Sequence, residues 1–180
     1  YHLQDGVGYV TRFNPDNSQH TTPQNYIDYH KYGVYASYQK NLTAWWNIKV
    51  GGELFYAKSK SNIDDSQPFN ATSWSGKLEG TSDFAFNSQR TILFTIQYLH
   101  MFPHDEDLVR YQTLSLLNAS LRWQLINGRL LFNLSASDPF VQNVTKATKR
   151  YSAYNEYTET NAHVRNVSLK ITYLFGSKKV

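Results

Sequence analysis

Two histidines and three acidic residues lie close together near the middle of the chain. His100 and His104 stand beside the run Asp105, Glu106 and Asp107. Hard cations prefer clustered carboxylates, so this segment could be a metal-binding or cation-collecting loop. The run lacks a defined ligand spacing, and a solvated acidic loop explains it better. We therefore predict no metal site.

A second set of charged residues combines both signs. Three carboxylates occur among four basic side chains, and no Gly-x-Ser-x-Gly elbow accompanies them. Such a mixture is typical of a wet lumen or of cross-strand salt bridges. We therefore expect no catalytic site, no cofactor and no enzyme activity, and we expect these side chains to face a lumen: Lys49, Glu53, Lys77, Glu79, Asp83, Arg122 and Lys170.

A tyrosine-rich segment spans residues 151–157 (YSAYNEY). Its rings could stack on sugars at an external binding surface, because aromatic faces favour such contacts. The segment is explained equally well as an extension of the aromatic girdle that membrane proteins carry at the membrane interface.

The composition favours strands and limits the partners. The chain has 180 residues, 14 Tyr, 10 Phe, 4 Trp and no Cys. Aromatic residues favour strands, and the absence of Cys excludes disulfide scaffolds and thiolate metal sites. The net charge of +4 comes from scattered Lys and Arg, so we expect no nucleic-acid partner. No stretch approaches the ~18 apolar residues of a spanning helix, whereas spanning β-strands leave only a weak hydropathy signal.

Alternating runs separated by turns predict about eight antiparallel strands. Short connections at residues 41–44, 87–89 and 127–128 alternate with longer polar ones at 14–25, 61–70, 103–109 and 149–158. Asn127-Gly128 between apolar runs is a strong hairpin signal, since both positions of a type I′ turn need positive φ. Outer-membrane barrels alternate tight periplasmic turns with longer external loops in this way. The expected strands are 3–13, 26–40, 45–60, 71–86, 90–102, 110–126, 129–148 and 159–175.

Parity separates a charge-free face from a charged face on these strands. Side chains alternate across a strand, and a Lys or Arg facing lipid at the midplane would cost ~2–4 kcal/mol. A soluble sandwich also alternates, with its apolar face inward. We expect the uncharged positions to face lipid: Trp46, Ile48, Val50, Leu54, Tyr56, Trp74, Leu78, Phe84, Ile92, Phe94, Ile96, Leu121, Trp123, Val167, Leu169, Ile171, Tyr173 and Phe175.

The spacing of aromatic residues favours the membrane over the sandwich. Trp46 and Tyr56 are ten positions apart on one parity, as are Trp74 and Phe84. Ten residues at ~3.3 Å rise and ~40° tilt cover roughly 25 Å, the height of the apolar band between two aromatic girdles. The predicted fold class is therefore all-β: an antiparallel up-and-down transmembrane β-barrel segment, either an open part of a larger barrel or a closed small one.

The C-terminal third resembles the end of TonB-dependent outer-membrane receptors of the Bacteroidetes type. The resemblance rests on residues 116–123 (LLNASLRW), the turn at 127–130 (NGRL), the element at 134–140 (LSASDPF) and the closing strand at 165–176 (RNVSLKITYLFG), followed by a basic tail. Pro139 departs from the usual aliphatic residue and suits a bulge, because it cannot donate to a strand ladder.

This resemblance implies a parent barrel of about 22 strands around a plug. The chain would be one segment, residues 1–180, that supplies the last strands of the wall, with the plug absent. It implies as partners outer-membrane lipid, the remaining strands and plug of the receptor, an energy-coupling protein and a surface lipoprotein. The expected location is the bacterial outer membrane, and the expected role is structural within a nutrient importer.

Two other functions fit the same patterns. A complete eight-stranded barrel, filled by its own side chains, would serve adhesion or envelope stability. The abrupt start in strand-like sequence favours a fragment instead. A secreted carbohydrate-binding β-sandwich would be soluble without detergent and would share its core between two sheets.

Overall fold

A computed structural model of the chain describes residues 2–16, 18–61, 69–106, 109–140, 144–150, 155–161 and 165–175. Every regular element in this part of the chain is a β-strand. None of the described residues forms a helix long and apolar enough to cross a membrane. The strands are β1 (His2–Phe13), β2 (Gln19–Asn41), β3 (Trp46–Ser61), β4 (Phe69–Ala85), β5 (Ile92–Met101), β6 (His104–Glu106), β7 (Val109–Tyr111), β8 (Leu114–Leu125), β9 (Leu130–Ser137), β10 (Val144–Arg150), β11 (Asn155–Asn161) and β12 (Asn166–Tyr173).

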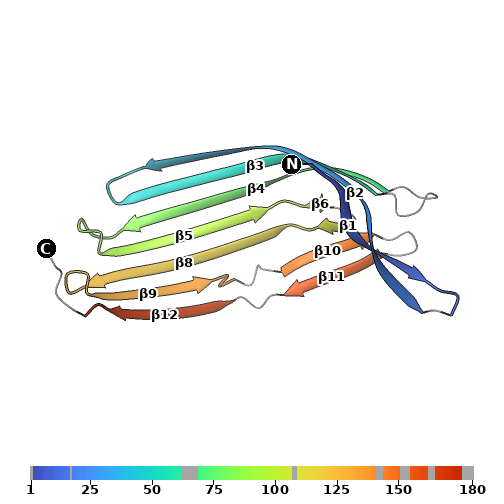
Figure 1. The fold of residues 1–180 in the computed structure, drawn as a ribbon. Helices are drawn as coiled ribbons and strands as arrows, with labels where there is room; N and C mark the ends of the chain where they lie inside the picture. Colours follow the sequence, from blue (N-terminus) through green and yellow to red (C-terminus); the bar gives the residue numbers. More distant parts are fainter. Residues whose placement is uncertain are drawn as a thin grey trace.

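Eight of these strands form one antiparallel sheet in the order β1-β2-β3-β4-β5-β8-β9-β12. Figure 1 shows this sheet as an open, curved layer in which β1 and β12 occupy opposite edges. A second sheet has the order β11-β10-β7-β6. The all-β, antiparallel, up-and-down prediction is confirmed, and the sheet is not closed into a ring.

Three tight turns lie together at one end of the large sheet, at the left of Figure 1. They connect β2 to β3, β4 to β5 and β8 to β9, where the short connections were predicted. Asn127 and Gly128 have φ of 53° and 84°, as the predicted turn requires, and Ile126 joins them at 52°. Only Gly adopts such angles without a steric cost, so this turn depends on Gly128.

The prediction of three unbroken strands after residue 109 is wrong, whereas the expected strand 90–102 is present as β5. β5 ends before Pro103, and the ladder at β9 ends at Asp138, next to Pro139. Proline has no N–H to donate, so each ladder stops and the chain leaves the large sheet. The expected strand 129–148 is therefore β9 and β10 in two different sheets, rather than one strand with a bulge. The expected strands 110–126 and 159–175 divide in the same way, into β7 and β8 and into β11 and β12.

The long connection predicted at residues 14–25 is also wrong. β1 and β2 pair as far as Phe13 and Gln19, and the turn between them is closed by the backbone N–H of Asn14 donating to the Ser18 carbonyl at 2.9 Å. The polar residues at the start of β2 continue the strand because their backbone groups are hydrogen-bonded to those of β1. Of the other predicted long connections, 103–109 contains β6, while residues 62–68 and 151–154 lie outside the described residues.

Candidate functional site

All the predicted lipid-facing residues that belong to strands lie on one face of the large sheet, as the strand register shows. Trp46 on β3 lies opposite Phe84 on β4, which lies opposite Phe94 on β5 and then Leu121 on β8. Directly paired residues point to the same side of a sheet, so parity on one strand sets parity on the next. We call this surface the apolar face. Phe175 follows the end of β12, and its ring contacts Tyr173 with centroids 4.7 Å apart.

No described element packs over the apolar face. Leu54 is 56% exposed, Trp74 69% and Leu169 61%. A sandwich would cover this face with a second sheet. The described element that folds over the sheet, β6, lies on the opposite face, where the His104 ring contacts Phe55 at 6.1 Å. An uncovered apolar surface of this extent requires an apolar environment or partner.

Two rows of aromatic rings cross the apolar face. At the end with the tight turns, Trp46 stacks on Phe84 at 5.7 Å, and Phe84 on Phe94 at 6.1 Å. Nearer the other end, Tyr56 packs on Trp74 with centroids 5.3 Å apart. The rows thus join the aromatic positions whose ten-residue spacing suggested two girdles. When such rings lie in lipid, their N–H and O–H groups need hydrogen-bond partners.

The Trp46 indole meets that need within the sheet. Its Nε1–H donates to the Ser82 hydroxyl at 2.7 Å, although Ser82 is a polar residue on the apolar face.

The opposite surface, which we call the polar face, carries all seven predicted lumen residues. Glu53 forms an ion pair with Lys31 on β2, with Nζ and Oε1 3.2 Å apart, and Lys77 pairs with Glu79 on its own strand, also at 3.2 Å. The Thr95 hydroxyl donates to Asp83 at 2.6 Å. Glu53 therefore forms a cross-strand salt bridge of the predicted kind, but its partner is Lys31, which the sequence patterns had not singled out, and the other ion pair lies within one strand.

Basic side chains exceed acidic ones where the polar face approaches the tight turns. Lys49 has no ion pair with any residue that the structure describes, and neither has Lys170. Arg122 and Lys170 flank Asn133 in one cross-strand row, and the Arg122 guanidinium pairs with the Gln124 side-chain amide.

A tyrosine from β2 crosses over β3 to reach β4. The Tyr35 hydroxyl donates to Glu79 Oε1 at 2.6 Å. Gly51 lies between them, and a Cβ added there would come within 2.6 Å of the Tyr35 oxygen and 3.1 Å of Glu79. Gly51 therefore leaves the space that the phenol occupies. Sequence reasoning missed Tyr35, and the available signal was a glycine inside a strand, which marks a close approach.

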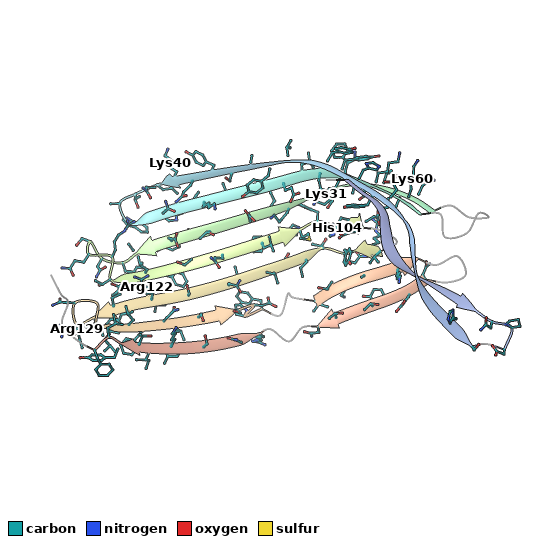
Figure 2. The ribbon with its side chains drawn as sticks, viewed as in Figure 1. Lys31, Lys40, Lys60, His104, Arg122 and Arg129 are labelled. Atoms are coloured by element: carbon teal, nitrogen blue, oxygen red, sulfur yellow. The ribbon has the colours of Figure 1, made fainter. Side chains whose placement is uncertain are left out.

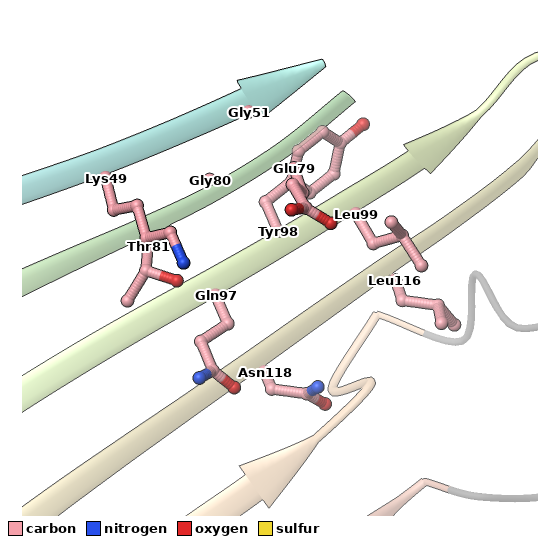
Figure 3. Close-up of a pocket in the computed structure, with 10 residues that line it drawn as sticks. All are labelled: Lys49, Gly51, Glu79, Gly80, Thr81, Gln97, Tyr98, Leu99, Leu116 and Asn118. Carbon is pink, nitrogen blue, oxygen red and sulfur yellow. The ribbon is translucent and has the colours of Figure 1, made fainter. Parts of the chain in front are cut away.

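A hollow of about 370 Å³ opens on the polar face beside this contact. Figure 3 shows Lys49, Thr81, Gln97 and Asn118 lying across four neighbouring strands, with Glu79 nearby. A cation, a carboxylate, a hydroxyl and two amides can both donate and accept hydrogen bonds. The hollow suits a hydrated polar ligand or a polar protein segment.

At the end away from the tight turns, packed side chains cover the polar face. Tyr29, Phe55 and Ala57 are 6%, 5% and 2% exposed and form a small core. His104 lies over this core and stacks on Tyr111 at 5.0 Å, while the Lys31 ammonium sits 3.8 Å from the Phe55 ring centroid.

The histidine and acidic cluster does not form a metal centre in the described part of the chain. His100 lies on the apolar face, opposite Leu78 and within 2.8 Å of the Ser115 hydroxyl, whereas His104 faces the core on the other side. Asp105 is 4.0 Å from Arg110. The described residues hold no group of three His, Cys, Asp or Glu that could bind a metal ion, and Asp107 lies outside them. Residues 151–154 of the tyrosine-rich segment also lie outside the described residues.

Comparison with known families assigns the chain. No significant match to it was found among curated proteins or among solved structures. The family model described as "Outer membrane protein beta-barrel family" matches residues 1–173, nearly the whole chain. That match agrees with the antiparallel strands and with the two chemically distinct faces described above. The chain belongs to the outer membrane protein beta-barrel family and is located in the bacterial outer membrane.

Proposed function

We propose that this chain forms part of the barrel wall of a TonB-dependent receptor that imports a nutrient. Its apolar face contacts lipid, its polar face lines the lumen, and the segment itself is structural. The observation that carries this proposal is the open eight-stranded sheet with one uncovered apolar face and one charged, hollowed face.

The edges of the sheet favour a larger barrel over a small closed one. An eight-stranded barrel of these strands would pair β1 with β12, whereas they lie at opposite edges of the sheet. Unpaired strand edges are costly in a bilayer, so both need further strands. The resemblance of residues 165–176 to the closing strand of the receptors supports the same choice.

Uptake by the producing bacterium tests the transport function. A strain without the gene is compared with the complemented strain for uptake of a panel of labelled nutrients, with and without a protonophore. We expect at least one nutrient to lose uptake in the deletion, and the protonophore to abolish that uptake in the complemented strain. Unchanged uptake of every nutrient would contradict the proposal.

Crosslinking tests the complete small barrel. The chain has no native Cys, so Gly8 on β1 is replaced by Cys together with Cys at Leu169, Ile171 or Tyr173 on β12 in turn. We expect no disulfide in oxidised membranes, because other strands separate the two edges. An efficient disulfide at one register would establish the small barrel instead.

A further inference from the structure

Charged residues reappear on the apolar face at the end away from the tight turns. Along β2, β3 and β4, the described apolar face carries no Lys, Arg, Asp or Glu between Lys40 at the turn end and Lys58 toward the other end. Lys60 follows on the same parity. Figure 2 shows Lys40 and Lys60 toward opposite ends of the sheet. The charge-free stretch of the face therefore ends at Lys58 on β3.

The strand register builds a polar surface around these lysines. Lys58 lies between His30 on β2 and Thr72 on β4, and the next row places Lys60 between Asp28 and Asn70. The row directly below consists of three aromatic rings, Tyr32, Tyr56 and Trp74. Ammonium, hydroxyl and amide donors therefore stand immediately above an aromatic row. We call these four donor residues, Lys58, Lys60, Thr72 and Asn70, the lysine rim.

The two ammonium groups of the lysine rim are not held in ion pairs within the described structure, although Asp28 lies opposite Lys60 in the strand register. Neither Lys58 nor Lys60 forms an ion pair with a described residue. The nearby Asp28 carboxylate lies 3.1 Å from Nε2 of His30. Lys60 is exposed and Lys58 is half-buried. Two ammonium groups therefore remain available to an anion from outside the chain.

The height of the lysine rim matches the headgroup layer of a bilayer. Aromatic rows mark the boundary between hydrocarbon and headgroups. Lys58 and Lys60 lie two and four residues beyond Tyr56 on β3, or roughly 5 and 10 Å farther along the bilayer normal for a strand tilted by ~40°. Tight turns are periplasmic in such barrels, and the lysine rim lies at the other end. It therefore faces the outer leaflet.

We propose that the lysine rim binds the phosphate groups of an anionic lipid in the outer leaflet of the outer membrane. Lys58 and Lys60 neutralise the phosphate charge, and Thr72 and Asn70 donate hydrogen bonds to its oxygens. The acyl chains lie along the apolar face below, beginning at the Tyr56 and Trp74 rings. This site rests on the lipid-facing orientation of the apolar face in the proposed function.

Lipid retention tests the site. The full protein is placed in phosphatidylcholine nanodiscs that contain graded amounts of bisphosphorylated lipid A or its dephosphorylated form, and bound lipid is counted by native mass spectrometry. We expect preferential retention of the phosphorylated lipid. A lysine near an anionic surface contributes about fivefold to affinity, so Lys58→Gln with Lys60→Gln should weaken retention about 25-fold.

Two matched variants separate charge from folding and position. Lys58→Arg with Lys60→Arg keeps both charges and should retain the lipid, while Lys40→Gln removes a lysine from the same face at the opposite end and should change nothing. Heat-modifiable gel mobility verifies that each variant is folded. Retention within twofold of wild type in the Gln double variant overturns the site, as does equal retention of dephosphorylated lipid.

Two further results would overturn the inference, and a labelling control would show which part of it had failed. Competition by millimolar inorganic phosphate would identify a general anion site and overturn the assignment to lipid. If Lys40→Gln lowered lipid retention and the Lys58/Lys60 double variant did not, the chain would have the opposite orientation in the membrane. That result would overturn the inference together with that part of the proposed function. Insertion of the apolar face into lipid, shown by a lipid-soluble label on the introduced thiol of a Leu78→Cys variant, would limit a failed lysine test to the site alone.

Discussion

A single arginine at mid-height on the apolar face should destabilise the barrel by about 2–4 kcal/mol. Val50 is the position of choice, because it lies on β3 between the two aromatic rows and is 45% exposed. Val50 is four residues from Trp46 and six from Tyr56, which corresponds to roughly 10 and 15 Å along the bilayer normal for a strand tilted by ~40°. An arginine there cannot bring its guanidinium to either interface without distorting the bilayer.

The control for Val50→Arg is Gln97→Arg on the polar face. Gln97 lies in the row of Lys49 and Thr81, one residue from the row of Val50, and its side chain is exposed beside the hollow. A charge added there stays hydrated, so stability should change by less than about 0.5 kcal/mol. Ile48→Arg, two residues from Trp46, should give an intermediate loss because the cost falls toward the interface.

Equilibrium unfolding by guanidinium in phosphatidylcholine vesicles, followed by tryptophan fluorescence, measures all three variants. The shift in midpoint multiplied by the slope gives the change in unfolding free energy. The reasoning fails if Val50→Arg and Gln97→Arg change stability equally, and a large loss confined to Gln97→Arg would mean that the two faces are assigned the wrong way round.

Three further outcomes follow from the geometry. Cys at Leu78 should react with a lipid-soluble maleimide and resist a bulky water-soluble one, and Cys at Thr81 should show the reverse; identical labelling of both sites would contradict the two-face model. Gly51→Val should displace the Tyr35 phenol, because a Cβ there would meet its oxygen at 2.6 Å, and ultraviolet resonance Raman spectroscopy should report the lost hydrogen bond, whereas an unchanged tyrosine signal would refute the contact. Asp16 in the β1–β2 turn accepts hydrogen bonds from Ser18, which lower the pKa of the Asp16 carboxyl below the ordinary 3.8. The ionised carboxylate therefore stabilises the folded state above pH 3.8, and this stabilisation is lost as the pH falls through the lower pKa of the folded state. An Asp16 pKa at or above 3.8 in a carboxyl-carbon NMR titration would contradict this expectation.

The residues predicted to share a face do share one in the structure, because parity is a local property of strands. Once Trp46 and Lys49 are assigned to opposite parities, the two-residue repeat carries that assignment along β3. Antiparallel pairing then passes it to Phe84 and Asp83 on β4 without any further information. The turn at Asn127-Gly128 was likewise predictable, since few other residue pairs tolerate positive φ at both positions.

The breaks and long-range contacts were not predictable in the same way. A proline shows that a ladder loses one donor, but only the structure shows that the chain after Pro103 and Pro139 joins a second sheet. The contact of His104 with Phe55 joins residues 49 positions apart through the fold-back of β6. Tyr35 and Glu79 meet only because β2 and β4 both flank β3.

The amino-acid sequence by itself determined which side chains share a face, where the tight turns fall and how far apart the aromatic rows stand. All three depend on backbone geometry within one strand or one hairpin, which neighbouring residues specify. The tertiary structure alone decided which charges pair, which end of the polar face is packed shut and where the lysine rim stands above the aromatic row. Those features depend on register between strands and on the path of β6, since each brings together residues whose separation along the chain says nothing about their distance in space.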